Sequence, residues 1–169
     1  GGIGSGTVIA QAIIDSQKKQ DNSLSLAGFM SHDKEISELV GGIPVVAKQS
    51  KENVQLLYEK GYSFIFALHR TDGGEKFVNL FYELGLQSEM LATFIHPTAY
   101  VAPDVFIDNG SVIMPYVMIS AQAKIEMNSL IMVGATIGHN THLRQFSHVA
   151  SQAVIGAHIV IDEGAHIGL

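Results

Sequence analysis

One aliphatic residue recurs at every sixth position through the second half of the chain. Thirteen consecutive positions at this spacing, from Ile95 to Ile167, are all Ile, Leu or Val. A small or β-branched residue, such as Ala99 or Ser111, follows four positions after each of the first twelve. This period is neither that of a helix nor the alternation of an ordinary strand. It predicts a parallel β-helix of short flat strands, each with one aliphatic side chain pointing inward.

Residues 1–93 lack this period and show ordinary helix and strand patterns instead. Amphipathic stretches predict helices over residues 6–19, 51–60 and 74–84. Apolar runs predict strands over residues 24–29, 43–47 and 62–68. Because the helices and strands alternate, we expect a small parallel sheet, an α/β Rossmann-like half-domain. The chain therefore divides into two predicted domains, residues 1–93 and 94–169.

A glycine-rich run, Gly1-Gly2-Ile3-Gly4-Ser5-Gly6, stands directly before the first predicted helix. Backbone N–H groups at a helix N-terminus bind anions such as a diphosphate when side chains leave them uncovered. Thr7 occupies the third glycine place of the G-x-G-x-x-G pattern, so a tight turn without a ligand is the alternative. The run has no initiator Met or strand before it, and the chain stops at Leu169. We expect an internal piece of a longer protein, without its first strand and last coils.

Three stretches of the repeat carry a family resemblance, namely Phe94-Ile95-His96-Pro97-Thr98-Ala99, Ile137-Gly138-His139-Asn140 and Phe146-Ser147-His148-Val149. Together with the glycine-rich run, they make nearly the whole chain similar to one class of hexapeptide-repeat enzymes. These are the sugar acetyltransferases of the sialic-acid O-acetyltransferase and bacillosamine N-acetyltransferase type. The resemblance implies a left-handed β-helix of about four coils, with three repeats in each coil. It also implies a homotrimer of parallel prisms.

The resemblance implies direct acetyl transfer from acetyl-CoA to an amino or hydroxyl group of a sugar, with a nucleotide-linked sugar as the expected substrate. His139 occupies the place of the general base, and an imidazole suits that role near neutral pH. His148 stands where the resemblance implies a residue near the thioester. The backbone N–H groups of Gly156 and Ala157 could stabilise the oxyanion that forms on the thioester carbonyl. The expected substrate-binding residues are Gly2, Gly4, Ser5, Gly6, Ser31, His32 and Asp33.

Three positions depart from the family pattern. Ser5 replaces a histidine near the end of the glycine-rich run, and only Asp33 remains of an acidic run after the second strand. Asn140 replaces the Asp or Glu that follows the catalytic histidine. An amide can orient an imidazole but cannot stabilise an imidazolium by charge, and the serine-protease template loses about 10⁴ in rate on Asp→Asn replacement. This change favours an amine acceptor, which needs less help than a hydroxyl.

Five of the eight histidines lie between residues 139 and 166, namely His139, His142, His148, His158 and His166. The repeat places His148 and His166 on successive coils, and it places His142 and His148 on equivalent corners. Two alternatives to catalysis by a histidine base stay open. The first is a zinc-dependent hydratase, because γ-type carbonic anhydrases hold zinc on the same kind of prism. The second is a structural or sugar-binding β-helix, with the histidines as polar corner residues.

Composition narrows the remaining function classes. The chain has 169 residues and a net charge of −6, which argues against nucleic-acid or anionic-membrane partners. It contains no cysteine, so a thiolate nucleophile and Cys-ligated metals are excluded, and we expect no metal cofactor. It has no long apolar run or leader typical of a membrane span or signal peptide. We therefore expect a cytoplasmic protein that binds small molecules.

Overall fold

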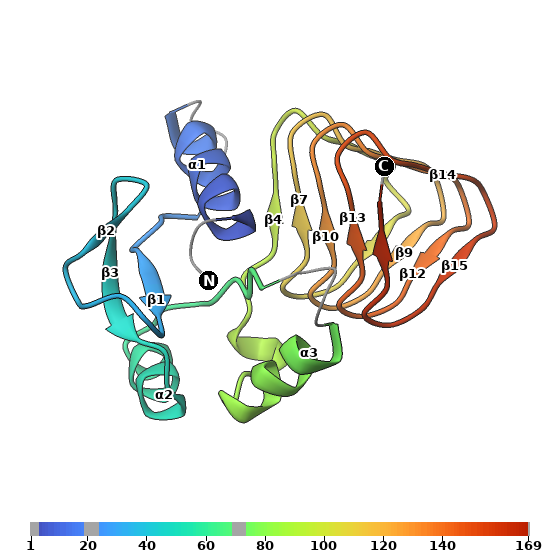
Figure 1. The fold of residues 1–169 in the computed structure, drawn as a ribbon. Coiled ribbons are helices and arrows are strands. Elements are labelled where there is room, and N and C mark those ends of the chain that lie inside the picture. The colour runs from blue at the N-terminus through green and yellow to red at the C-terminus, as the bar shows by residue number, and fades with distance from the viewer. Residues whose placement is uncertain (1–3, 19–23, 69–73, 169) are drawn as a thin grey trace.

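A computed structural model describes residues 4–18, 24–68 and 74–168 of the chain. A small α/β half comes first, and a prism of short parallel strands follows from Phe94 onward (Figure 1). Within the described residues, no helix is both long and apolar enough to cross a bilayer.

The prism has three faces, each a sheet of stacked two-residue strands that pair in parallel. Face 1 consists of β4 (Phe94–Ile95), β7 (Val112–Ile113), β10 (Leu130–Ile131), β13 (His148–Val149) and β16 (His166–Ile167). Face 2 consists of β5 (Tyr100–Val101), β8 (Met118–Ile119), β11 (Thr136–Ile137) and β14 (Val154–Ile155). Face 3 consists of β6 (Phe106–Ile107), β9 (Lys124–Ile125), β12 (His142–Leu143) and β15 (Val160–Ile161). Such stacked parallel sheets fit the left-handed β-helix expected from the repeat.

The predicted inward position of the repeated aliphatic residues is confirmed, because each strand places its second residue inside the prism. Ile113 pairs with Ile131, and Ile131 pairs with Val149, so residues 18 apart lie in register. The central inward residues are fully buried, whereas Ile95 on the first strand is 42% exposed. Ile95 lies on the first strand of the prism, so no earlier coil covers its side chain.

Two-residue turns join the strands at the corners of the prism. The second turn residue often has a left-handed backbone, as at Gln122 (φ 59°), Asn140 (57°) and His158 (58°). The first turn residue is proline at Pro97 and Pro103, because the ladder of backbone hydrogen bonds does not use its N–H. The amide N–H groups at this first position therefore remain outside the ladder.

The α/β half contains three helices, α1 (Ser5–Lys18), α2 (Lys51–Glu59) and α3 (Gly74–Glu83), and a short 3₁₀ helix, η1 (Ser88–Met90). Its sheet has the order β1-β3-β2, with β1 (Phe29–Ser31), β2 (Leu39–Val40) and β3 (Ile43–Lys48). The parallel pairing of β1 with β3 and the three helices agree with the sequence prediction. The prediction missed β2, which forms an antiparallel hairpin with β3 through Gly41 and Gly42.

Two predicted strands are wrong. The strand expected over residues 24–29 begins only at Phe29, because Gly28 packs against Pro44, which has no N–H for a ladder bond. The strand expected over residues 62–68 reduces to one bridge between Phe64 and Leu91. The side chain of Phe66 is buried against α3 instead of in a sheet. Within residues 62–68 only Phe66 is buried and Tyr62 is exposed, so the predicted buried strand does not form.

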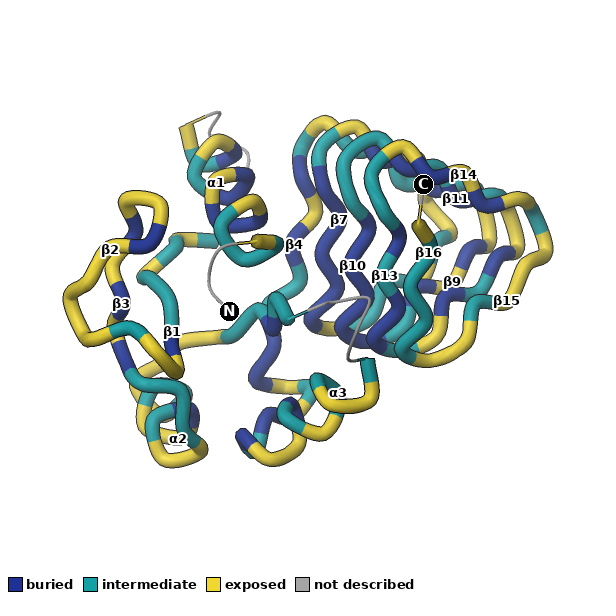
Figure 2. Tube along the Cα trace, viewed as in Figure 1, coloured by how far each residue is buried: buried dark blue, intermediate teal, exposed yellow. Residues whose placement is uncertain are grey.

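The α/β half packs onto face 1 of the prism. Ile9 and Ile13 of α1 belong to the same buried cluster as Phe94 and Leu130, so the outward side of face 1 is covered (Figure 2). Phe81 of α3 packs edge-to-face on Phe146, which lies at the corner between faces 3 and 1, with the ring centroids 5.1 Å apart. The outward residues of faces 2 and 3 are largely exposed. The edge between those two faces therefore lies opposite the α/β half (Figure 1).

Candidate active site

His139 and Asn140 form the turn between β11 and β12, at the edge between faces 2 and 3, which we call the 2–3 corner. Backbone bonds fix this turn to the coils on either side. The N–H of Asn140 donates to the carbonyl of Ala121 (3.0 Å), and the N–H of His158 donates to the carbonyl of His139 (3.0 Å). Both side chains of the turn are exposed, so a substrate can approach them.

A short chain of hydrogen bonds orients the imidazole of His139. Its Nδ1 lies 2.8 Å from Oδ1 of Asn140. The amide Nδ2 of Asn140 donates to Oε1 of Gln122, one coil earlier, at 2.7 Å. Because Oδ1 can only accept, the proton of neutral His139 sits on Nδ1. The lone pair then lies on Nε2, which is the form a general base needs.

His158 lies one coil further along the same corner, beside His139. The two rings meet edge-to-face, with centroids 4.9 Å apart and an interplanar angle of 86°. From the sequence, His158 belongs only to the histidine group, and neither His158 nor Gln122 is predicted to lie in the site. The signal was available, because Gln122, Asn140 and His158 are spaced by one coil of the repeat.

The structure places Gly156 and Ala157 next to this turn. A Cβ atom built on Gly138 would lie 2.5 Å from the carbonyl carbon of Gly156 and 2.5 Å from the nitrogen of Ala157. Thr141 fixes the neighbouring backbone, because its hydroxyl donates to the carbonyl of Gly156 at 2.7 Å. Ala157 occupies the first turn position, so the ladder of backbone bonds does not use its N–H. One corner thus carries a candidate base and a nearby backbone donor.

His148 lies elsewhere. It is the first residue of β13 on face 1, stacked on His166 of β16 with the ring centroids 4.2 Å apart. The predicted stacking of these two histidines is confirmed, with Nδ1 to Nδ1 at 2.5 Å. The expectation that His142 and His148 occupy corners is wrong, because both begin strands. Within one chain, His148 and the 2–3 corner belong to different parts of the prism.

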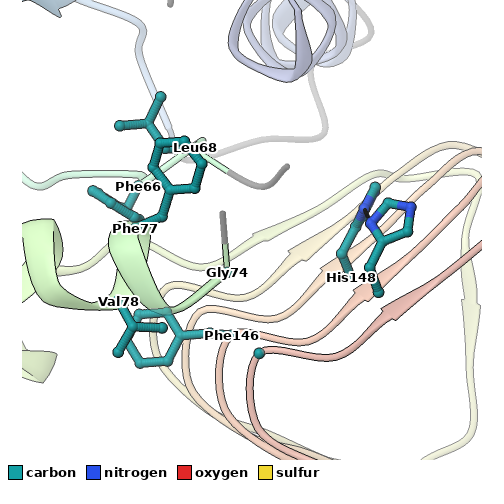
Figure 3. Close-up of a pocket in the computed structure, with 9 residues that line it drawn as sticks. Phe66, Leu68, Gly74, Phe77, Val78, Phe146 and His148 are labelled. Atoms are coloured by element: carbon teal, nitrogen blue, oxygen red, sulfur yellow. Dashed lines mark hydrogen bonds between the residues drawn. The ribbon is translucent and has the colours of Figure 1, made fainter. Parts of the chain in front are cut away.

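A small cavity beside His148 separates face 1 from the α/β half. Phe66, Leu68, Phe77 and Phe146 line it together with His148 (Figure 3). Its volume is about 20 Å³, which is room for about one water molecule. This cavity is too small for a thioester.

Glu126 and His142 form a second polar cluster, on the outside of face 3. Oε1 of Glu126 lies 2.7 Å from Nε2 of His142 and 3.0 Å from Nζ of Lys124. Burial alone would raise the pKa of the Glu126 carboxyl, but hydrogen bonds from Lys124 and His142 outweigh it and hold this pKa below its ordinary value of 4.5. These contacts of Glu126 tie β9 to β12.

The expected substrate-binding residues of the α/β half lie around the start of α1 and the end of β1. Gly6 faces Phe29 of β1, because a Cβ atom built there would lie 3.7 Å from the Phe29 ring. Gly4 is exposed, and its carbonyl accepts the N–H groups that begin the helix after Ser5. Gly2 lies outside the described residues.

Ser31, His32 and Asp33 follow at the end of β1. The hydroxyl of buried Ser31 donates to Oδ1 of Asp33 at 2.9 Å. This bond and the backbone N–H of Asp33 lower the pKa of the Asp33 carboxyl from its ordinary 3.8. His32 and Asp33 are exposed, so they are open to a ligand at this edge of the sheet.

Comparison with known proteins agrees with the fold. No family model matches the chain. The acetyltransferase domain of PglB from Neisseria gonorrhoeae, solved in complex with acetyl coenzyme A, superposes with a TM-score of 0.52. The sequences are 19% identical, and the match covers 99% of this chain and 89% of that one. This chain has the same fold.

A second solved structure is PerB from Caulobacter crescentus, in complex with CoA and GDP-perosamine. It is 21% identical, with a TM-score of 0.48, and the match covers 98% of this chain and 89% of that chain. The hexapeptide-repeat β-helix fold expected from the sequence is thus confirmed by the strand stacking and by the superposition on the PglB domain.

In the described part of the chain, no group of three or more His, Cys, Asp or Glu side chains is placed to hold a metal ion. The zinc-hydratase alternative therefore gains no support from a single chain. The chemistry that the 2–3 corner offers instead is proton transfer at Nε2 of His139, close to a backbone N–H donor at Ala157.

Proposed function

We propose that this protein is an acetyl-CoA-dependent acetyltransferase that acts on an amino group of a sugar, with a nucleotide-linked sugar as the acceptor. The proposal rests on the hydrogen bond between Nδ1 of His139 and Oδ1 of Asn140, because this bond leaves Nε2 free to act as a base at an exposed corner. The PglB domain, which shares the fold, is an acetyltransferase domain in complex with acetyl coenzyme A.

The proposed reaction is direct transfer in a ternary complex. The acceptor nitrogen attacks the thioester carbonyl carbon while Nε2 of His139 takes its proton, a role typically worth about 10²–10⁴ in rate. The negative charge that develops on the carbonyl oxygen faces the N–H of Ala157. The carbon–sulfur bond then breaks, and the CoA thiolate takes the proton back from the imidazolium. The products are an acetamide and free CoA.

Asn140 favours an amine acceptor in this reaction. A carboxylate beside His139 would stabilise the imidazolium by charge, whereas the amide of Asn140 supplies only orientation. An unprotonated amine is already a good nucleophile and needs little proton removal before attack. A hydroxyl needs more, so its acylation would suffer more from the missing charge.

The acceptor would extend between copies of the chain. Its nucleotide would lie against Gly4, Ser5 and Gly6, and His32 and Asp33 at the end of β1 would help to hold it. The α/β half covers face 1, whereas His139 belongs to the 2–3 corner, between the two faces that this half leaves open. A sugar bound to this half would therefore meet His139 of a neighbouring copy, which supports the expected homotrimer.

An acceptor panel tests the proposed function. Free thiol released from acetyl-CoA is measured with nucleotide-linked amino sugars and with matched hydroxyl sugars, each with and without a metal chelator. We expect thiol release with the amino sugars, weaker or no release with the hydroxyl sugars, and no effect of the chelator.

Other outcomes of the panel contradict the proposal. Faster turnover of hydroxyl acceptors would reverse the preference for an amine. Loss of activity in chelator would favour the zinc alternative. Ligand binding without any thiol release would favour a sugar-binding β-helix.

A further inference from the structure

The amide of Asn140 has two chemically different ends, and only one of them suits a base at His139. With Oδ1 toward Nδ1, neutral His139 carries its proton on Nδ1 and keeps Nε2 free. If the amide were turned by half a rotation, its –NH₂ would donate to Nδ1 and move the proton to Nε2. That tautomer cannot take a proton from a substrate at Nε2. A carboxylate has no such problem, because both of its oxygens accept.

Gln122 decides between these two orientations. Its Oε1 accepts from Nδ2 of Asn140 at 2.7 Å. In the turned orientation, Oδ1 of Asn140 would face Oε1 of Gln122, and two acceptors would repel each other without a proton between them. The contact therefore favours the orientation in which Oδ1 lies 2.8 Å from Nδ1 of His139.

Asp104 lies one coil before Gln122, so Asp104, Gln122 and Asn140 form a column along the 2–3 corner. Oδ1 of Asp104 accepts the backbone N–H of Gln122 at 3.2 Å. This hydrogen bond fixes the backbone of the turn from which the Gln122 side chain extends.

We propose that Gln122 is a positioning residue for the catalytic base. Its side-chain carbonyl holds the Asn140 amide in the orientation in which neutral His139 carries its proton on Nδ1. This inference rests on the proposed function for its kinetic consequence. The tautomer itself does not depend on any substrate. The column compensates for the amide at residue 140, where a carboxylate would need no such support.

The test combines one variant that removes the acceptor with one that keeps it. Gln122→Met has a similar length but cannot accept a hydrogen bond, and Gln122→Glu retains acceptor oxygens. The matched control is Gln152→Met, because Gln152 is also exposed and also occupies the left-handed position of a turn (φ 63° against 59°) at another corner of the prism. Each variant is also made together with Asn140→Asp.

Nitrogen NMR of the histidine ring gives the first readout, without substrate. We expect His139 to be protonated at Nδ1 in the wild type, in Gln122→Glu and in Gln152→Met, and to gain an Nε2–H population in Gln122→Met. An unchanged tautomer in Gln122→Met would overturn the proposal, even if the protein proves to have another activity.

The rate of thiol release gives the second readout. We expect kcat to fall about 5-fold in Gln122→Met, the size of one lost hydrogen bond, while Gln122→Glu and Gln152→Met stay within 2-fold of the wild type. In the Asn140→Asp background, Gln122→Met should cost less than 2-fold, because a carboxylate needs no fixed orientation. An equal loss in both backgrounds would show a structural effect and overturn the proposal. If no acceptor is turned over by any variant, the proposed function fails, and the NMR result still decides the role of Gln122.

Discussion

Single atoms decide whether the 2–3 corner can do acid–base chemistry. The proton of His139 is fixed by one oxygen of Asn140, and the backbone donor at Ala157 is placed by the absence of one carbon at Gly138. No other residue type fits at Gly138, because a Cβ there would overlap main-chain atoms, which cannot swing away as a flexible side chain can. Both details depend on contacts between successive coils.

Gly138→Ala tests this close approach. We expect the substitution to reduce the free energy of unfolding by about 1–3 kcal/mol, because the coil that carries Gly156 must shift. Thermal or chemical unfolding measures this loss. Gly168→Ala is the matched control, since no atom lies within 4 Å of a Cβ at that position and its backbone needs no left-handed conformation. Equal stability of the two variants would contradict the described contact.

Pairs of strands are held by polar contacts as well as by the aliphatic interior. On face 3, Glu126 joins β9 to β12 through His142 and is itself held by Lys124. The pKa of Glu126 lies below its value in the unfolded chain, so the carboxylate stabilises the fold while it is ionised. This contribution is complete above about pH 4.5 and is lost as the pH falls through the folded pKa.

Glu126→Gln tests this contribution through its pH dependence. We expect the variant to be less stable than the wild type by about 1 kcal/mol at pH 7, with the difference disappearing as the pH falls below 4.5. Urea unfolding at several pH values measures it. Glu83→Gln, at an exposed position on α3, should show no such pH-dependent difference. A difference for Glu126→Gln that persists in acid would show that charge is not its cause.

The repeat can be predicted from the sequence because each strand places one aliphatic residue inside the prism. These inward residues therefore recur at every sixth position. The site was only partly readable. The sequence predicts the residues around His139. It also predicts a corner position for His148, whereas this residue begins a strand. The apolar run 62–68 predicts a buried strand, but only Phe66 is buried, and apolar character does not specify whether a sheet or a helix provides its packing partner. The contact between Gln122 and Asn140 depends on side-chain orientation, which spacing alone does not give.

At the scale of the whole molecule, one face of the prism is used inside the chain and the others remain open. Face 1 is covered by the α/β half, whereas the outward residues of face 2 are exposed in a single chain, with Tyr100 at 59%, Met118 at 49% and Val154 at 75%. An exposed apolar row of this kind is typical of surfaces that meet another molecule. It supports the proposed assembly of several copies, with each site shared between two of them.

Complementation tests whether the site is shared. Ser5→Asp places a negative charge where the nucleotide diphosphate would bind, and an acidic residue is well tolerated in the first turn of a helix. We expect Ser5→Asp and His139→Ala to be nearly inactive alone. Co-expressed as mixed assemblies, they should recover a fraction of the thiol release, because some sites combine an intact loop with an intact His139. No recovery in confirmed mixed assemblies would place both halves of the site in one chain.

In the proposed mechanism, His139 removes the acceptor proton during acetyl transfer. The most direct measurement is kcat for thiol release by His139→Ala, with His142→Ala as the control from the same prism. We predict a loss of about 10²–10⁴ for His139→Ala and little change for His142→Ala. Equal turnover by the wild type and His139→Ala would contradict the account.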